Sequence, residues 1–166
     1  MNSAGRHLII DAVLTKESRP IVTSTSKMAE YLEKVSDITG MTLVFPPIAV
    51  KFPFAGETHR LINNLIKEGT TSPVIEEFKQ HIQQRNTQGS GVSAMSMWLE
   101  SHCTLHTWPE YDYISIDLFS CKTYEYDYLL EFTKNYMQLR GGHVLVVDRF
   151  MNMPASVKRL VIEDAF

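Results

Sequence analysis

A series of closely spaced strand-like segments in the second half of the chain constrains the fold more than any other feature. Residues 92–99 and 103–107 have strand-forming composition and flank the dipeptide Glu100-Ser101. In residues 113–119, polar and aromatic side chains alternate with Ile114, Ile116 and Leu118. This period of two is typical of a strand with one buried face. The pattern predicts that Ser101 lies between strands or at the end of one.

The first half of the chain predicts a strand, a helix and a second strand. Residues 7–14 are apolar and partly alternating, which indicates a strand. Residues 26–39 carry apolar side chains at helical spacing, and Gly40 is placed to end that helix. Residues 41–52 read as a strand that Pro46-Pro47 bends, because proline donates no hydrogen bond to a sheet.

The remaining segments complete the expected order. Residues 53–90 differ in character, with two short helical stretches and a polar loop, and read as an insertion. Residues 124–139 have helical spacing that Gly141-Gly142 should stop before a strand at 143–147. The residues after that strand read as an accessory tail.

The element order favours an α+β fold. A single domain over residues 1–166 is long enough to bury a core. We expect a two-layer sandwich, with a mainly antiparallel sheet and helices on one face.

Composition excludes several classes of function. A formal charge of -3 provides no basic field for nucleic acid or anionic lipid. No apolar run approaches membrane-spanning length, and the N-terminal residues lack the features of a signal peptide, so we expect a cytoplasmic protein. In that reducing compartment, Cys103 and Cys121 are predicted to be free thiols. His102 and His106 lie in an extended segment, where four-residue spacing does not give paired helical ligands, so no metal is expected.

The segment from Glu100 to Glu110, ESHCTLHTWPE, gathers groups that can cleave a backbone. Ser101 follows a glutamate, His106 comes five residues later, Cys121 lies further along, and Ser93 comes shortly before. Serine is a weak nucleophile, so self-cleavage needs a nearby base or acid and a polarised upstream carbonyl. Glu100-Ser101 is the candidate peptide bond.

This string resembles the processing site of the pyruvoyl-dependent S-adenosylmethionine decarboxylases of the short prokaryotic type. The resemblance implies that Ser101 attacks the Glu100 carbonyl and that the chain separates into residues 1–100 (the β chain) and 101–166 (the α chain). Ser101 would become a covalent pyruvoyl cofactor, which forms a Schiff base with the substrate amine and acts as the electron sink for decarboxylation.

The resemblance also assigns roles to individual residues. Cys121 corresponds to the proton donor, His106 to the residue that assists processing, and Ser93 to a hydrogen-bonding group at the reacting centre. Glu110 corresponds to the glutamate that holds the substrate ribose. The family's adenine-stacking aromatic has no counterpart at the usual spacing, and we assign this role to Phe52, displaced by the 53–90 insertion.

Three hypotheses follow. The first is an S-adenosylmethionine decarboxylase for polyamine (spermidine) synthesis, with the family's homodimer of processed chains. The second retains the pyruvoyl chemistry but acts on arginine or ornithine. The third is an uncleaved, non-catalytic homologue that regulates a partner.

Overall fold

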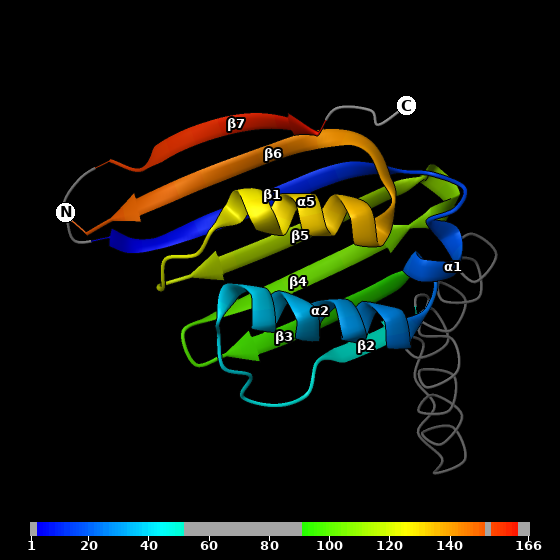
Figure 1. The fold of residues 1–166 in the computed structure, drawn as a ribbon, viewed down its shortest axis with the longest axis horizontal. Coiled ribbons are helices and arrows are strands. Elements are labelled where there is room, and N and C mark those ends of the chain that lie inside the picture. Colours follow the sequence, from blue (N-terminus) through cyan, green and yellow to red (C-terminus); the bar gives the residue numbers. More distant parts are fainter. Residues whose placement is uncertain (1–2, 52–90, 152–153, 163–166) are drawn as a thin grey trace, which may run out of the picture.

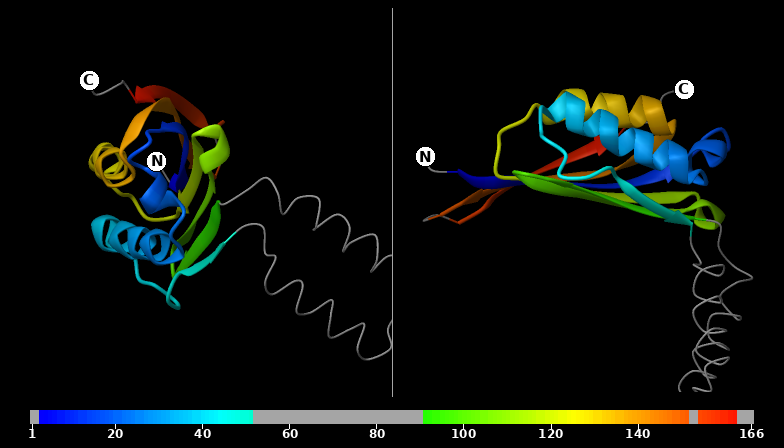
Figure 2. Two further views of the ribbon diagram at one scale, coloured as in Figure 1. Left: turned by 90° about the vertical axis from the view of Figure 1, so that its right-hand side faces the viewer. Right: turned by 90° about the horizontal axis from the view of Figure 1, so that it is seen from below.

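The described part of the chain forms a single antiparallel sheet covered on one face by two long helices. The computed structural model describes residues 3–51, 91–151 and 154–162. In these residues seven strands form one sheet in the order β2-β3-β4-β5-β1-β6-β7. Helices α2 and α5 lie side by side on the same face, and no other described element covers the opposite face (Figure 1; Figure 2, right).

The strands and helices have the following bounds. The strands are β1 (Ser3–Leu14), β2 (Ile48–Lys51), β3 (Val92–Trp98), β4 (Ser101–Trp108), β5 (Tyr113–Ser120), β6 (Leu139–Phe150) and β7 (Ser156–Ile162). The helices are α1 (Arg19–Val22), α2 (Thr25–Thr39) and α5 (Tyr126–Met137), with a 3-10 turn, η1 (Pro109–Tyr111). All the strand pairs are antiparallel.

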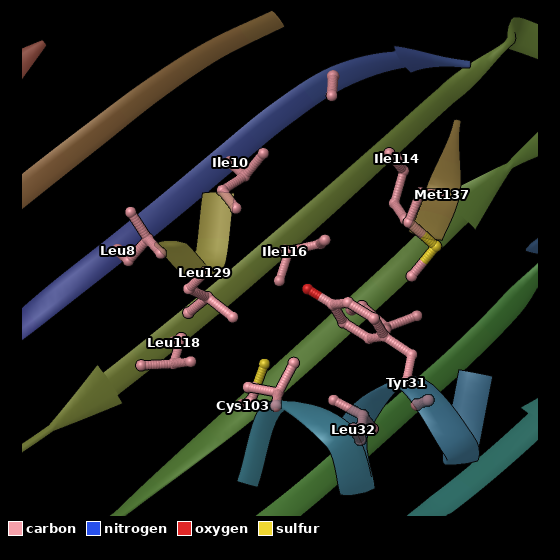
Figure 3. Packing of buried hydrophobic residues seen from close by; sticks show 14 of the residues in the cluster. Leu8, Ile10, Tyr31, Leu32, Cys103, Ile114, Ile116, Leu118, Leu129 and Met137 are labelled. Carbon is pink, nitrogen blue, oxygen red and sulfur yellow. The ribbon is translucent and has the colours of Figure 1, made fainter. Parts of the chain in front are cut away.

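The core lies between the helices and the face of the sheet that they cover, here called the inner face. Strand β5 shows the pattern most clearly, because its side chains alternate between buried and half-buried. Figure 3 shows apolar side chains of β1, β4 and β5 meeting side chains of α2 and α5. Burial of this surface supplies the main driving force for folding.

Local sequence explains where α2 begins and ends. The Ser24 side chain accepts a hydrogen bond from the backbone N–H of Lys27, which caps the first turn. Gly40 adopts a left-handed conformation with φ of 62°, which glycine reaches without steric cost. The two long helices are joined in the core by a hydrogen bond of 2.9 Å between the Tyr31 and Thr133 hydroxyls.

Most of the predicted elements are confirmed. The α+β sandwich with helices on one face is present, as are the first strand, the helix α2 and the three strands that surround Ser101. Within the described residues, no helix is both long and apolar enough to cross a bilayer. The predicted 53–90 insertion lies outside the described residues.

Three predictions about local structure are wrong. Residues 41–45 form no strand beyond a single bridge between Leu43 and Trp98, and β2 begins only after the two prolines. Helix α5 ends at Met137, where Gln138 takes the left-handed conformation instead of a glycine. The supposed tail contains β7, because its backbone pairs with β6 along the edge of the sheet.

Gly142 has a different role from the predicted helix stop. It lies in β6 opposite Ala12. A Cβ atom at this position would lie 2.5 Å from the Asp11 carbonyl oxygen. Glycine therefore permits close approach of β6 to β1 and does not terminate the helix.

Candidate functional site

A tight hairpin places Ser101 at the start of a central strand. Strands β3 and β4 are joined by Leu99 and Glu100 alone, and Ser101 is the first residue of β4. Its neighbours across the sheet are Trp98 on one side and Ser120 on the other. Pairing on both sides fixes the backbone directly after the Glu100–Ser101 bond.

The carbonyl that precedes Ser101 is polarised by a backbone donor. The Cys121 N–H donates a hydrogen bond of 3.2 Å to the Glu100 carbonyl oxygen. The Ser101 Oγ is buried and has no hydrogen-bond partner in the described structure. A donor on the oxygen where negative charge develops favours attack on the carbonyl carbon. We call Glu100, Ser101 and Cys121 the hairpin site.

The Glu100 side chain accepts a longer hydrogen bond than the Glu100 carbonyl does. Its Oε2 accepts a hydrogen bond of 3.5 Å from the Thr42 N–H, at the outer limit for such a contact. Among the described non-glycine residues, positive φ angles occur at Asp112 and Gln138. The Glu100–Ser101 peptide therefore carries no strain from a left-handed backbone conformation.

The two cysteines have opposite environments, and both are free thiols, as predicted. Cys121 is exposed, and its backbone N–H is hydrogen-bonded to the Glu100 carbonyl. Cys103 is 0% exposed, and burial raises its thiol pKa because the core disfavours the thiolate. Figure 3 shows Cys103 among core side chains. Of the two, Cys121 alone combines an exposed thiol with a backbone contact to Glu100.

Ser93 and His106 form a second group, the Ser93–His106 pair. They lie directly opposite each other on β3 and β4, and Ser93 Oγ is hydrogen-bonded to His106 Nδ1 at 2.9 Å. The His106 side chain is on the uncovered, or outer, face of the sheet, with its ring centroid 5.8 Å from that of Trp108. A largely apolar groove around the pair is lined by Ile48, Val50, Ser93, Ala94, Met95, Thr104 and His106.

One chain does not bring these two groups together. His106 follows Ser101 by five residues, which corresponds to roughly 17 Å along an extended strand. The alternation along β4 places the Ser101 side chain on the inner face, with that of Cys103, and the His106 side chain on the outer face. Glu110 lies beyond the far end of β4, exposed in η1. Phe52, the predicted adenine-stacking residue, lies outside the described residues.

Sequence reasoning proposed the serine and the thiol but gave no indication of the donor that polarises the carbonyl. That donor is a backbone N–H, which every residue other than proline carries, so composition and spacing give no signal for it. It is positioned because β5 pairs with β4 and ends opposite Ser101.

Fold and site together define a class: α+β proteins that hold a serine directly after a polarised carbonyl at a hairpin. The family model described as S-adenosylmethionine decarboxylase matches residues 57–150. The chain belongs to the S-adenosylmethionine decarboxylase family. This confirms the resemblance drawn from the string that starts at Glu100 and the prediction that the chain is a decarboxylase.

Individual relatives agree with this assignment. The chain is 32% identical over 89 residues to an S-adenosylmethionine decarboxylase proenzyme of Saccharolobus islandicus, covering 49% of this chain and 72% of the relative. A proenzyme of the same description from Saccharolobus solfataricus is 54% identical over 89 residues, covering 49% and 71%. A shorter match, 55% over 31 residues, is to an arginine decarboxylase proenzyme of Ignicoccus hospitalis, covering 19% and 22%.

Proposed function

We propose that the chain is a proenzyme that cleaves itself between Glu100 and Ser101 and then decarboxylates S-adenosylmethionine. The observation that carries this proposal is the hydrogen bond from the Cys121 N–H to the Glu100 carbonyl, beside an unpartnered serine hydroxyl. The product would be the decarboxylated sulfonium compound, an aminopropyl donor for polyamine synthesis.

Cleavage uses the chain's own atoms. Ser101 Oγ attacks the Glu100 carbonyl carbon, and the acyl group moves from nitrogen to oxygen, which leaves an ester. The Ser101 α proton then passes to a base, the Cβ–Oγ bond breaks, and Glu100 departs as a carboxylate. Water releases ammonia from the remaining enamine and leaves a ketone at residue 101.

The hairpin site fits the resulting pyruvoyl group, because the precursor hydroxyl lies at a polarised carbonyl and beside an accessible thiol. The bound group supplies the electron sink for loss of carbon dioxide. Cys121 would return a proton to the former α-carbon, since its exposed thiol adjoins the hairpin. Cys103 is unsuited to this role because its thiol is enclosed in the core.

We also propose that a second copy of the chain completes each site. The Ser93–His106 pair is about 17 Å along β4 from Ser101 and on the opposite face of the sheet. The pair therefore cannot serve the Ser101 of its own chain without a large rearrangement. A second copy that packs at the end of the sheet, against the β3–β4 hairpin, would allow each chain to offer its Ser93–His106 pair, and its Glu110, to the Ser101 of the other. This agrees with the homodimer implied by the resemblance.

Mass spectrometry and a carbon dioxide assay test the proposed function. The purified protein should consist of residues 1–100 and a blocked chain of residues 101–166, and Ser101→Ala should remain one chain of 19.0 kDa. Release of carbon dioxide from S-adenosylmethionine should accompany cleavage. An intact wild-type chain would overturn the proposal in favour of the uncleaved regulatory homologue.

Arginine decarboxylation is the second candidate. It is favoured by the short match to the arginine decarboxylase proenzyme, although that match covers a much smaller part of the chain. The same assay with arginine and ornithine distinguishes the candidates. Turnover of arginine or ornithine without turnover of S-adenosylmethionine would retain the processing chemistry and replace the substrate.

A further inference from the structure

Three buried polar atoms without partners belong to the β3–β4 hairpin and lie on the inner face of the sheet. In the described residues, Ser96 Oγ, Trp98 Nε1 and Ser101 Oγ are each buried and make no hydrogen bond. Ser96 is 0% exposed and Trp98 is 2% exposed. Such atoms are rare in folded proteins because each one costs free energy, so three together at a reactive hairpin call for a functional explanation.

Trp98 differs from the two serines because its polar atom can only donate a hydrogen bond. It lies directly across from Ser101 in the β3–β4 ladder. Directly opposite side chains on one face have Cβ atoms about 5 Å apart, within reach of an indole ring. The indole N–H can only donate, so its missing partner must be an acceptor.

The processing chemistry supplies that acceptor. During elimination the bond between Ser101 Cβ and Oγ breaks, and the bonding electrons stay on Oγ. This oxygen leaves as part of the Glu100 carboxylate. The other oxygen of that carboxylate is the original carbonyl oxygen, which already accepts from the Cys121 N–H. One oxygen of the leaving group therefore has a donor, and the oxygen derived from Ser101 needs a second.

We propose that the Trp98 indole N–H donates to this second oxygen and stabilises the Glu100 carboxylate as it leaves. This inference rests on the proposed self-cleavage. Before reaction the N–H has no partner, and it gains a charged acceptor as negative charge develops on Oγ. A donor whose bond strengthens toward the transition state accelerates the step, whereas one equally engaged before reaction would not. Trp98 thus acts on elimination, after the ester has formed.

Trp98→Phe tests the inference because it keeps an apolar ring and removes the N–H. We expect elimination to slow about 10- to 100-fold, the range for loss of one hydrogen bond to a charged group. The ester should then accumulate. Hydroxylamine would cleave it to give a C-terminal chain that begins with a free serine, which Edman sequencing detects.

Tyr31→Phe is the matched control. It also removes one buried donor, the hydroxyl bonded to Thr133, but in the core away from the hairpin. Processing by this variant should keep the wild-type rate and leave no ester. Wild-type processing by Trp98→Phe, or slow processing with the peptide bond intact, would overturn the inference.

If Trp98→Phe does not fold, the NMR resonance of the unsubstituted Trp98 indole tests the inference. With 15N-labelled indole groups, the Trp98 N–H proton should move downfield between uncleaved Ser101→Ala and the processed protein. Trp108, on the other face of the sheet, provides the internal reference. An unchanged Trp98 resonance would overturn the inference. Failure of the proposed function looks different, because the wild type itself would stay uncut.

Discussion

The two ends of strand β4 carry complementary parts of the chemistry. At its start the hairpin site holds a buried serine hydroxyl and a carbonyl that the Cys121 N–H polarises. Five residues further on, the Ser93–His106 pair lies on the outer face beside an open groove. The first end has a hydroxyl and a polarised carbonyl without a neighbouring histidine, and the second has a histidine that is remote from the Glu100–Ser101 bond. The difference teaches that one chain keeps the groups of the proposed processing chemistry apart, at the two ends of β4.

Co-expression of two inactive variants gives the largest expected effect. Ser101→Ala and His106→Ala chains with different tags should each remain uncut alone. In a hybrid dimer, one site combines the intact Ser101 of one chain with the intact His106 of the other. The His106→Ala chain should therefore be cleaved only in the hybrid, which mass spectrometry of the purified mixed dimer detects.

Pairing His106→Ala with a chain that carries both substitutions is the control, and it should give no cleavage. Cleavage of His106→Ala by itself would show that the histidine is dispensable. A purified hybrid that stays uncut would place the whole site within one chain.

Cys121→Ala separates the thiol from the backbone donor of the same residue. The N–H to Glu100 remains, so self-cleavage should continue, whereas decarboxylation per cleaved site should fall about 100-fold or more because the proton donor is lost. The measurement is carbon dioxide release normalised to the cleaved fraction.

Cys103→Ala is the matched thiol variant for this experiment. It should keep turnover within about twofold and lower the free energy of unfolding by about 1–2 kcal/mol, since Cys103 is buried in the core. Equal loss of turnover in both variants would refute the assignment of Cys121.

Ser93→Ala tests whether the serine orients His106. Loss of the bond between Ser93 Oγ and His106 Nδ1 should slow processing about fivefold, the usual worth of one neutral hydrogen bond. The measurement is the half-time of cleavage after uncleaved, denatured protein is refolded. Ser115→Ala removes a serine from the opposite side of His106 and should leave the half-time unchanged. If both variants behave alike, Ser93 has no special role.

Glu100→Gln should have the smallest effect. The side chain makes one hydrogen bond of 3.5 Å, to the Thr42 N–H, while the reactive carbonyl belongs to the backbone. Cleavage should stay within about twofold of wild type by the same assay. A drop of tenfold or more would bring the Glu100 carboxylate into the processing machinery.

Regular periodicity made much of the fold predictable. The alternation in residues 113–119 and the helical spacing in 26–39 report directly which side of each element is buried. The errors arose where pairing partners decide the outcome. Residues 41–45 have no continuous partner strand. Gly142 permits the close approach of β6 to β1. Strand β7 forms because its backbone pairs with the free edge of β6.

The sequence by itself determined the family and pointed to the candidate peptide bond, because the string from Glu100 to Glu110 concentrates distinctive residue types at fixed spacing. Only the tertiary structure decided which groups meet. Strand pairing brings the Cys121 N–H to the Glu100 carbonyl, encloses Cys103 in the core and separates His106 from Ser101. Spacing along a chain gives residue order, whereas register and sheet face set distance, and the chemistry depends on distance.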